Sequence, residues 1–184
     1  MRIFIGTAIP AATSQDLGTK LREELAGPFW RMAPVTQWHV TTLFIGERRE
    51  TVIPAISGAI ARLAESHAPI LLKHGRVVTM PKQEPTMLWV RFQPNPALTA
   101  LHVSLAQATG TGPSIHRPYW PHITLARAIA GHPGPVDGPV VLPLLVIDHL
   151  TLFHITPSSA GSVHHPIASW PLSGRGPVAP VVVD

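Results

Sequence analysis

The sequence predicts a mixed helix-and-strand protein in which two similar lobes share one site. Two stretches of the chain have the same predicted order: a strand, a helix with a capping residue, a loop, and a strand that carries a His-x-Thr triplet. The two histidines, His39 and His122, are 83 residues apart, and the predicted helix caps, Thr13 and Asn95, are 82 apart. This nearly constant spacing predicts two lobes related by a pseudo-twofold axis, each contributing one triplet to a central cleft.

A strand and a helix are predicted before the first triplet. Residues 2–9 are apolar at both alternating sets of positions, which predicts a strand buried on both faces. Thr13 can cap the helix that follows, and the charge of Asp16 suits its positive end. Leucines then recur at helical spacing, and Gly27 with Pro28 is predicted to end the helix.

The first triplet lies on a strand that a second helix follows. The strand that carries His39 and Thr41 is predicted to end at Gly46. The helix is predicted from a Thr51 cap to about Ser66, because apolar side chains recur at helical spacing and a proline falls in the first turn.

The second half repeats this order and then adds strands. Strands are predicted at 69–79 and 86–93 with a hairpin connection at 81–85, a helix from Asn95-Pro96 to Gly110, and the strand of His122 and Thr124. After Ala128, a loop at 131–135 is predicted to lead to strands at about 140–155 and 163–171, joined by a turn at 157–161.

Length and composition indicate one domain with a sizeable core. The chain has 184 residues, of which 45% are hydrophobic. We predict a single bilobal domain over residues 1–173 and a mobile tail at 174–184, where little can pack. The absence of cysteine excludes disulfides and thiolate metal sites and is typical of the cytoplasm, where we expect the protein.

The charge pattern favours a local anion site. Fourteen Lys and Arg residues against ten Asp and Glu give a net charge of +4, but the basic residues are dispersed along the chain.

Apolar runs are too short to span a bilayer, so we expect neither membrane insertion nor secretion. The histidines lack the spacing of a metal site with carboxylate partners, and no obligatory protein partner is evident.

Four His-x-Thr triplets occur, so the triplet alone does not identify a site. His149 and His154 also begin such triplets, but they lie on one predicted strand with opposite parity, so they would face opposite sides. His102 falls within a helical pattern, and we expect it on the helix surface. For His39 and His122, two interpretations remain: core-facing histidines of a repeated unit, or a paired site.

The paired site has a definite chemistry. In an extended strand, residues two apart point to the same side, so each triplet presents an imidazole beside a hydroxyl. A neutral imidazole can accept a proton while a protonated one donates a proton. Threonine hydroxyls can donate hydrogen bonds to phosphate oxygens, so two facing triplets would stabilise a negatively charged phosphorus centre without a metal.

These residues resemble the 2H phosphoesterase superfamily, named for two His-x-Thr or His-x-Ser motifs, and most closely its RNA 2′,3′-cyclic phosphodiesterase branch, also called 2′-5′ RNA ligases. The resemblance spans most of the chain, and the second triplet with its arginine is its most specific part. Thr42 and Trp38 depart from the residues usual beside the first triplet. The matching stretches are Arg2-Ile3-Phe4-Ile5, Arg31-Met32-Ala33-Pro34, His39-Val40-Thr41, Phe44-Ile45-Gly46, Pro121-His122-Ile123-Thr124-Leu125-Ala126-Arg127, Leu150-Thr151-Leu152-Phe153 and Ser169-Trp170-Pro171-Leu172.

The resemblance implies a bilobal α+β fold, with antiparallel sheets flanking the cleft and helices outside. It also implies hydrolysis of 2′,3′-cyclic phosphates, at RNA ends or on small nucleotides, to 2′-phosphates without a cofactor. One of His39 and His122 would activate water and the other would protonate the departing 3′-oxygen, in an order that the sequence does not assign. Thr41 and Thr124 would hold the phosphate.

Two further residues are implied as substrate contacts. Arg127 would contact the phosphate, although strict alternation puts it opposite His122, so this role requires a bulge or the end of the strand. Tyr119, or its neighbour Trp120, would stack on a terminal base, unless both simply pack a lobe.

The same residues are compatible with other functions. The same residues could catalyse 2′-5′ RNA ligation, or the hydrolysis of another cyclic phosphate or of a 2′-5′ oligonucleotide. A different class of function is an RNA-end-binding module without turnover, which the pI near 10.3 would suit.

Overall fold

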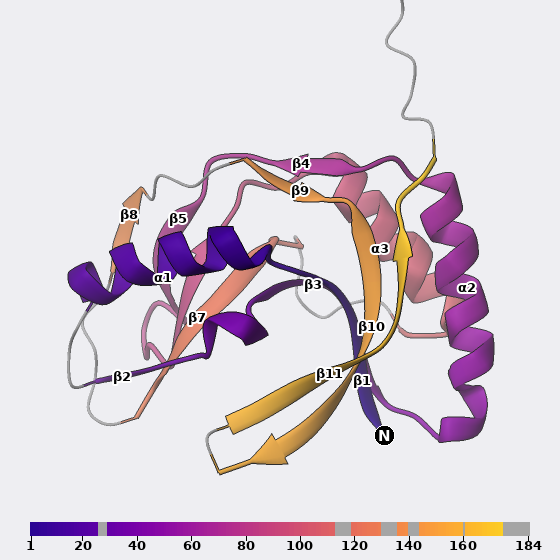
Figure 1. The fold of residues 1–184 in the computed structure, drawn as a ribbon, viewed down its shortest axis with the longest axis horizontal. Coiled ribbons are helices and arrows are strands. Elements are labelled where there is room, and N and C mark those ends of the chain that lie inside the picture. Colours follow the sequence, from indigo (N-terminus) through magenta and orange to yellow (C-terminus); the bar gives the residue numbers. More distant parts are fainter. Residues whose placement is uncertain (26–28, 113–118, 130–135, 140–143, 160, 175–184) are drawn as a thin grey trace, which may run out of the picture.

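The described residues form a nine-stranded, largely antiparallel sheet with three α-helices around it (Figure 1). The computed structural model describes residues 1–25, 29–112, 119–129, 136–139, 144–159 and 161–174. The helices are α1 (Ala11–Leu25), α2 (Ile53–Ser66) and α3 (Pro96–Ala108), with 3₁₀ turns at Val35–Gln37 and Glu50–Val52. The strands are β1 (Arg2–Ala8), β2 (Trp30–Met32), β3 (His39–Glu47), β4 (Ile70–Leu72), β5 (Arg76–Met80), β6 (Met87–Arg91), β7 (His122–Ala128), β8 (Asp137–Pro139), β9 (Leu145–Ile147), β10 (His149–Ser158) and β11 (Gly161–Pro171).

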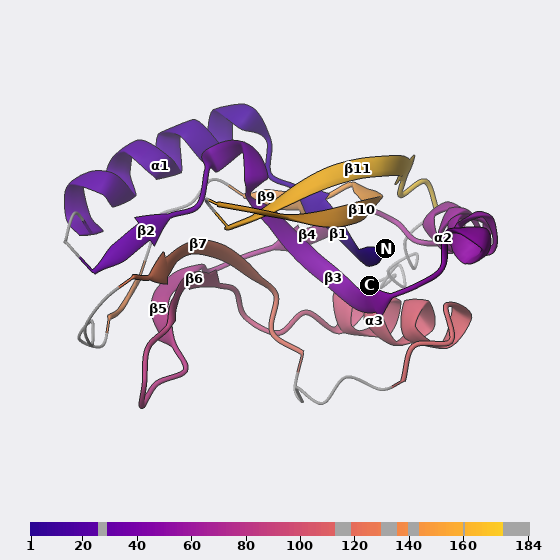
Figure 2. The ribbon, with the colours of Figure 1, turned by 90° about the horizontal axis from the view of Figure 1, so that it is seen from below.

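The strand order confirms the predicted duplication. The sheet has the order β11-β10-β1-β3-β7-β6-β5-β8, with β2 beside β7. In one lobe β1 leads through α1 to its neighbour β3, and in the other β6 leads through α3 to its neighbour β7. Figure 2 shows α1 and α3 at opposite ends and on opposite sides of the molecule, as a pseudo-twofold axis requires. The fold is therefore the predicted α+β fold with two similar lobes.

The two lobes meet where β3 and β7 are paired. The described ladder between these strands is a single pair, Val40 opposite Ile123, and both side chains are buried. The sheets of the two lobes are thus continuous at this point. The helices complete the core: α2 packs on α3 and on the β10–β11 hairpin, and α3 packs on β3.

Two predicted helix caps are wrong, and one is confirmed. Helix α1 begins at Ala11, so Thr13 lies inside its first turn, and Asp16 pairs with Lys20 at 2.9 Å on the helix surface. Thr51 lies in the 3₁₀ turn before α2, whose N-cap makes no side-chain hydrogen bond. Asn95 caps α3 as predicted, because its Oδ1 accepts a hydrogen bond from the backbone N–H of Leu98 at 3.1 Å.

Other boundaries differ because distant segments pair. The strand predicted at 69–79 is divided into β4 and β5 near His74, whose φ is +54°, and β4 pairs with β9 in a separate two-stranded sheet. The strand predicted at about 140–155 is represented by β9 and β10. The predicted loop at 131–135 and the predicted tail from residue 175 lie outside the described residues. No helix in the described part of the chain is long and apolar enough to cross a membrane.

Gly6 sets how closely β1 approaches β3. A Cβ atom at this position would lie 2.7 Å from the carbonyl oxygen of Val40, which is a backbone atom at the junction of the lobes. We expect Gly6→Ala to lower the free energy of unfolding by about 1–3 kcal/mol, as overpacking does, in urea denaturation. Gly112→Ala is the matched control, since no atom of the described residues lies within 4 Å of its Cβ position. A Gly6→Ala variant as stable as the control would contradict this account.

Candidate active site

The junction of β3 and β7 brings the two predicted triplets together. Val40 and Ile123 point into the core, so the residues on either side of them point to the opposite face. His39, Thr41, His122 and Thr124 are all partly exposed there. Because the strands are antiparallel, each histidine lies near the threonine of the other triplet.

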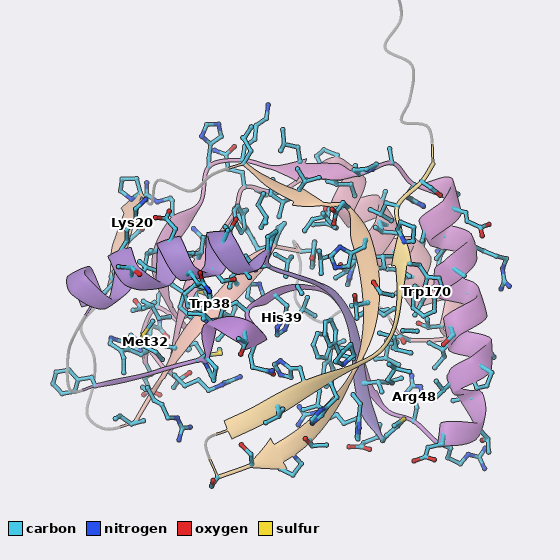
Figure 3. All side chains as sticks on the ribbon, in the orientation of Figure 1. Lys20, Met32, Trp38, His39, Arg48 and Trp170 are labelled. Carbon is cyan, nitrogen blue, oxygen red and sulfur yellow. The ribbon has the colours of Figure 1, made fainter. Side chains whose placement is uncertain are left out.

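A pocket of about 490 Å³ opens on this face and is lined by both lobes. The view in Figure 3 shows His39 between α1 and the β10–β11 hairpin. The pocket residues are Arg2, Phe4, Arg31, Met32, Ala33, Pro34, Gln37, His39, Thr41, Phe44, Met87, Thr124, Arg127, Ile155, Gly161, Ser162 and His164. A larger hollow of about 680 Å³ lies between the end of α2 and the start of α3, but it contains neither triplet.

Each imidazole ring is oriented by a hydrogen bond to the backbone carbonyl two residues earlier. Nδ1 of His39 lies 2.8 Å from the carbonyl oxygen of Gln37, and Nδ1 of His122 lies 2.9 Å from that of Trp120. A carbonyl oxygen only accepts, so each Nδ1 carries a proton and donates it. In the neutral ring the lone pair is then on Nε2, which makes Nε2 the nitrogen that can take up a proton.

His39 is kept neutral by its surroundings. Its ring is largely buried and contacts the rings of Phe4 and His164, each with a centroid separation of 4.7 Å. The pKa of His39 is lowered to about 4: burial lowers it most, the Gln37 carbonyl opposes this, and the nearby histidines His164 and His122 contribute to the lowering. The ring of His122 stacks on Trp89 with a centroid separation of 3.8 Å.

A bulge in β7 brings Arg127 to the pocket. Leu88 lies opposite Ala126 while Trp89 lies opposite Thr124, so Leu125 is an extra residue in β7. The extra residue shifts the parity, and Arg127 lines the same pocket as Thr124. The bulge therefore places Arg127 on the same face as Thr124, as a contact of Arg127 with the phosphate requires.

The other lobe has the equivalent bulge. Gly6 lies opposite Thr41 and Ile5 opposite Leu43, which makes Thr42 the extra residue of β3. After it, the 46%-exposed ring of Phe44 lines the pocket, and Phe44 precedes Arg127 by the same 83 residues that separate the histidines. The duplicated site thus has an aromatic side chain in one lobe where the other has a cation.

Comparisons with known proteins identify the family of this chain. The family model of the 2′-5′ RNA ligase superfamily matches residues 10–133. The chain belongs to this superfamily. Two relatives named RNA 2′,3′-cyclic phosphodiesterase are each 30% identical to it: one from Bacillus subtilis (strain 168), over 134 residues that cover 71% of this chain and 73% of the relative, and one from Thermus thermophilus, over 159 residues that cover 78% and 76%.

Solved structures share the fold. A Thermus thermophilus protein covers 96% of this chain and 100% of its own, with a TM-score of 0.84 and 23% identity. Escherichia coli LigT in its apo form covers 92% and 96%, with a TM-score of 0.77 and 21% identity. The resemblance to the 2H phosphoesterases is confirmed, and the chain is a member of an enzyme family.

In this superfamily member, sequence reasoning missed several pocket residues. Arg2 and Arg31 line the pocket together with the predicted Arg127, and the described lining residues include no carboxylate. Phe44 could have been found from the 83-residue spacing. Arg31 lies opposite Arg127 because β2 pairs with β7, a pairing that no local pattern indicates.

Besides His39, the pocket is lined by a second imidazole, that of His164. It lies on β11, and its backbone N–H donates a 2.7 Å hydrogen bond to Oε1 of Gln37. Gln37 thus contacts both His39, through its carbonyl, and His164, through its side chain. Burial lowers the pKa of His164, with smaller effects from Arg127 and His165 in the same direction and an opposing one from Gln37.

The structure does not bring Tyr119 into the pocket. Its hydroxyl donates a 2.7 Å hydrogen bond to the carbonyl of Thr41, its ring stacks on His102 at 4.7 Å, and burial raises its pKa. The prediction that His102 is a helix-surface residue is wrong: it is 8% exposed, and its Nδ1 donates to the carbonyl of Thr42 at 2.7 Å. Tyr119 and His102 thus donate hydrogen bonds to the carbonyl oxygens of two consecutive residues, Thr41 and Thr42, at the β3 bulge.

The other two triplets lie elsewhere. His149 pairs with Asp148, and His154 lies opposite His165 on β11. Both lie on β10, away from the β3–β7 junction that brings His39 and His122 together. Within the part of the chain that the structure describes, no group of three or more His, Asp or Glu side chains is arranged to hold a metal ion.

Proposed function

We propose that this protein hydrolyses 2′,3′-cyclic phosphates, at RNA ends or on small nucleotides, to 2′-phosphates. The observation that carries the proposal is the meeting of the two triplets at the Val40–Ile123 pair, beside a pocket with three arginines. The names of the two 30%-identical relatives support it.

We assign the role of general base to His39. Its lowered pKa leaves it neutral near pH 7, with the lone pair on Nε2. In this mechanism Nε2 removes a proton from water, the water oxygen bonds to phosphorus, and the bond between phosphorus and the 3′-oxygen breaks. Protonated His122 gives its proton to the departing 3′-oxygen, which leaves a 2′-phosphate and a 3′-hydroxyl.

The threonines and arginines would stabilise the charge on the phosphate. The hydroxyls of Thr41 and Thr124 can donate hydrogen bonds to its non-bridging oxygens, from opposite lobes. Arg127 adds a planar, permanently charged donor that can bind two oxygens at once. The guanidinium of Arg2 lies 5.1 Å from the centre of the Phe44 ring. These two side chains would form a wall of the pocket that contacts the nucleoside.

The test of this function is the product of a simple assay. The protein is incubated with a 2′,3′-cyclic mononucleotide in excess chelator, and the product is separated by chromatography. We expect the 2′-phosphate. A 3′-phosphate product, or no product, would refute the proposed mechanism.

The pH profile tests the role of His39. We expect the acidic limb of kcat/KM to lie near pH 4, because His39 must be neutral to accept a proton and its pKa is about 4. Activity is lost as the pH falls through that value. His164→Gln removes a side chain that lowers this pKa, so it should move the limb to higher pH. A wild-type limb at about pH 6.5, the ordinary histidine value, would contradict the assignment.

The family description supports a second reaction at the same site, 2′-5′ RNA ligation. If a 5′-hydroxyl replaced water, the same base and acid would form a 2′-5′ phosphodiester. Adding a 5′-hydroxyl RNA to the cyclic-phosphate assay distinguishes the two, because only ligation gives a longer product.

A further inference from the structure

An aromatic and cationic surface adjoins the second triplet on the side away from Arg127. It consists of Trp89, Arg91 and Trp120, which we call the Arg91–Trp120 surface. Arg91 lies opposite His122 and Trp89 opposite Thr124 in the β6–β7 ladder. Side chains of opposite residues point to the same face of a sheet, so the surface shares a face with the candidate active site.

The contacts within the surface are specific. The guanidinium of Arg91 lies 4.6 Å from the centre of the Trp120 ring. The ring of Trp89 lies under that of His122, with an interplanar angle of 17°. The backbone N–H of Phe92 donates to the carbonyl of Pro121 at 2.9 Å, which extends the ladder past His122 toward Trp120.

The order along β7 gives the surface a direction. Arg127 and Thr124 line the pocket, His122 follows, and Trp120 comes next toward the N-terminal end. Trp120 precedes β7 by two residues, and two residues of extended chain span at most about 7 Å, so Trp120 lies within that distance of His122 along the chain. A chain attached to a nucleotide in the pocket could therefore continue over this surface.

The chemistry of the surface suits single-stranded nucleic acid. No carboxylate in the described part of the chain forms an ion pair with Arg91, so its charge is available to a phosphate. Trp120 is partly exposed and offers a flat ring on which a base can stack. Guanidinium groups on tryptophan rings are also stable platforms for bases, through cation–π attraction.

We propose that Arg91 and Trp120 bind the nucleotide that precedes the cyclic-phosphate end, so that the preferred substrate is an RNA strand and not a mononucleotide. Trp89 stacks on His122 and so joins this surface to the second triplet. The proposal rests on the proposed function, whose substrate class it narrows.

The kinetic test compares two substrates with the same terminal nucleotide: a 2′,3′-cyclic mononucleotide and a trinucleotide with a 2′,3′-cyclic end. We expect wild-type kcat/KM to be about 5- to 150-fold higher for the trinucleotide, the range of one base-stacking interaction. Trp120→Ala and Arg91→Ala should reduce this ratio toward one, while Trp120→Phe should keep most of it. Arg62→Ala, on the exposed face of α2, is the charge-matched control and should leave the ratio unchanged.

Two results would overturn the proposal. One is a wild-type ratio near one. The other is an equal loss on both substrates in the Trp120→Ala and Arg91→Ala variants, which would mean that these side chains position His122 and bind no RNA.

A binding measurement separates this proposal from the proposed function. Fluorescence anisotropy with a labelled trinucleotide that ends in a 2′-phosphate needs no turnover. We expect Arg91→Ala to weaken binding and to reduce the slope of log K against log salt concentration by about 0.7, the value for one contact with a single strand. Trp120→Ala should weaken binding with the slope unchanged.

If neither cyclic substrate were hydrolysed but both variants bound the trinucleotide more weakly, with a changed salt slope only in Arg91→Ala, the proposed function would fail and the RNA-binding surface would stand. Equal binding by wild type and both variants would overturn the surface even if hydrolysis occurred.

Discussion

Replacing either His39 or His122 with alanine should lower kcat/KM for a 2′,3′-cyclic mononucleotide by about 10²–10⁴-fold, the usual contribution of a positioned acid or base. The two rings have separate roles in the proposed mechanism, so each loss should be large by itself. The double variant should have nearly the same kcat/KM as the less active of the two single variants, because the acid and the base act in the same step.

The matched control is His154→Ala. His154 begins the same tripeptide pattern, but it lies on β10 opposite His165, away from the β3–β7 junction. It should retain wild-type activity, and all three single variants should unfold cooperatively in thermal denaturation. Unchanged rates in both His39→Ala and His122→Ala would refute the site, and an equal loss in His154→Ala would show that the assay reports stability and not chemistry.

Replacing Thr41 or Thr124 with valine should lower kcat by about 10²–10³-fold, as the loss of one hydrogen-bond donor to a developing negative charge does. Valine keeps the shape of the side chain and removes only the hydroxyl. Both threonines line the pocket from opposite lobes, so we expect similar losses from the two changes.

Serine provides the control for these variants. Thr41→Ser and Thr124→Ser retain the donor and should keep most of the activity. The effect should fall on kcat, because the hydroxyls are proposed to bind the transition state more strongly than the substrate. A rise in KM with kcat unchanged would instead show that the threonines only bind the ground state.

The duplicated framework could be predicted from the sequence because it depends on local patterns. The repeated order of elements around the triplets indicated β3 and β7, helical spacing indicated α3, and the Asn95 cap was identified from its residue type. The equal spacing of these elements distinguished His39 and His122 from the triplets at His149 and His154. Helix starts without a polar cap could not be found in this way, since α1 and α2 begin at Ala11 and Ile53.

The sequence by itself determined the two lobes and the triplet that each carries, because residue type, helical spacing and repeat length can be read from the chain itself. The pairing of β3 with β7 then brought the two triplets together. Only the tertiary structure decided what surrounds them. One-residue bulges at Thr42 and Leu125 turn Phe44 and Arg127 into the pocket, and a bulge changes parity without changing composition. His164 reaches His39 through the hydrogen bond of its backbone to Gln37, 127 residues earlier in the chain, and no local pattern encodes such a contact.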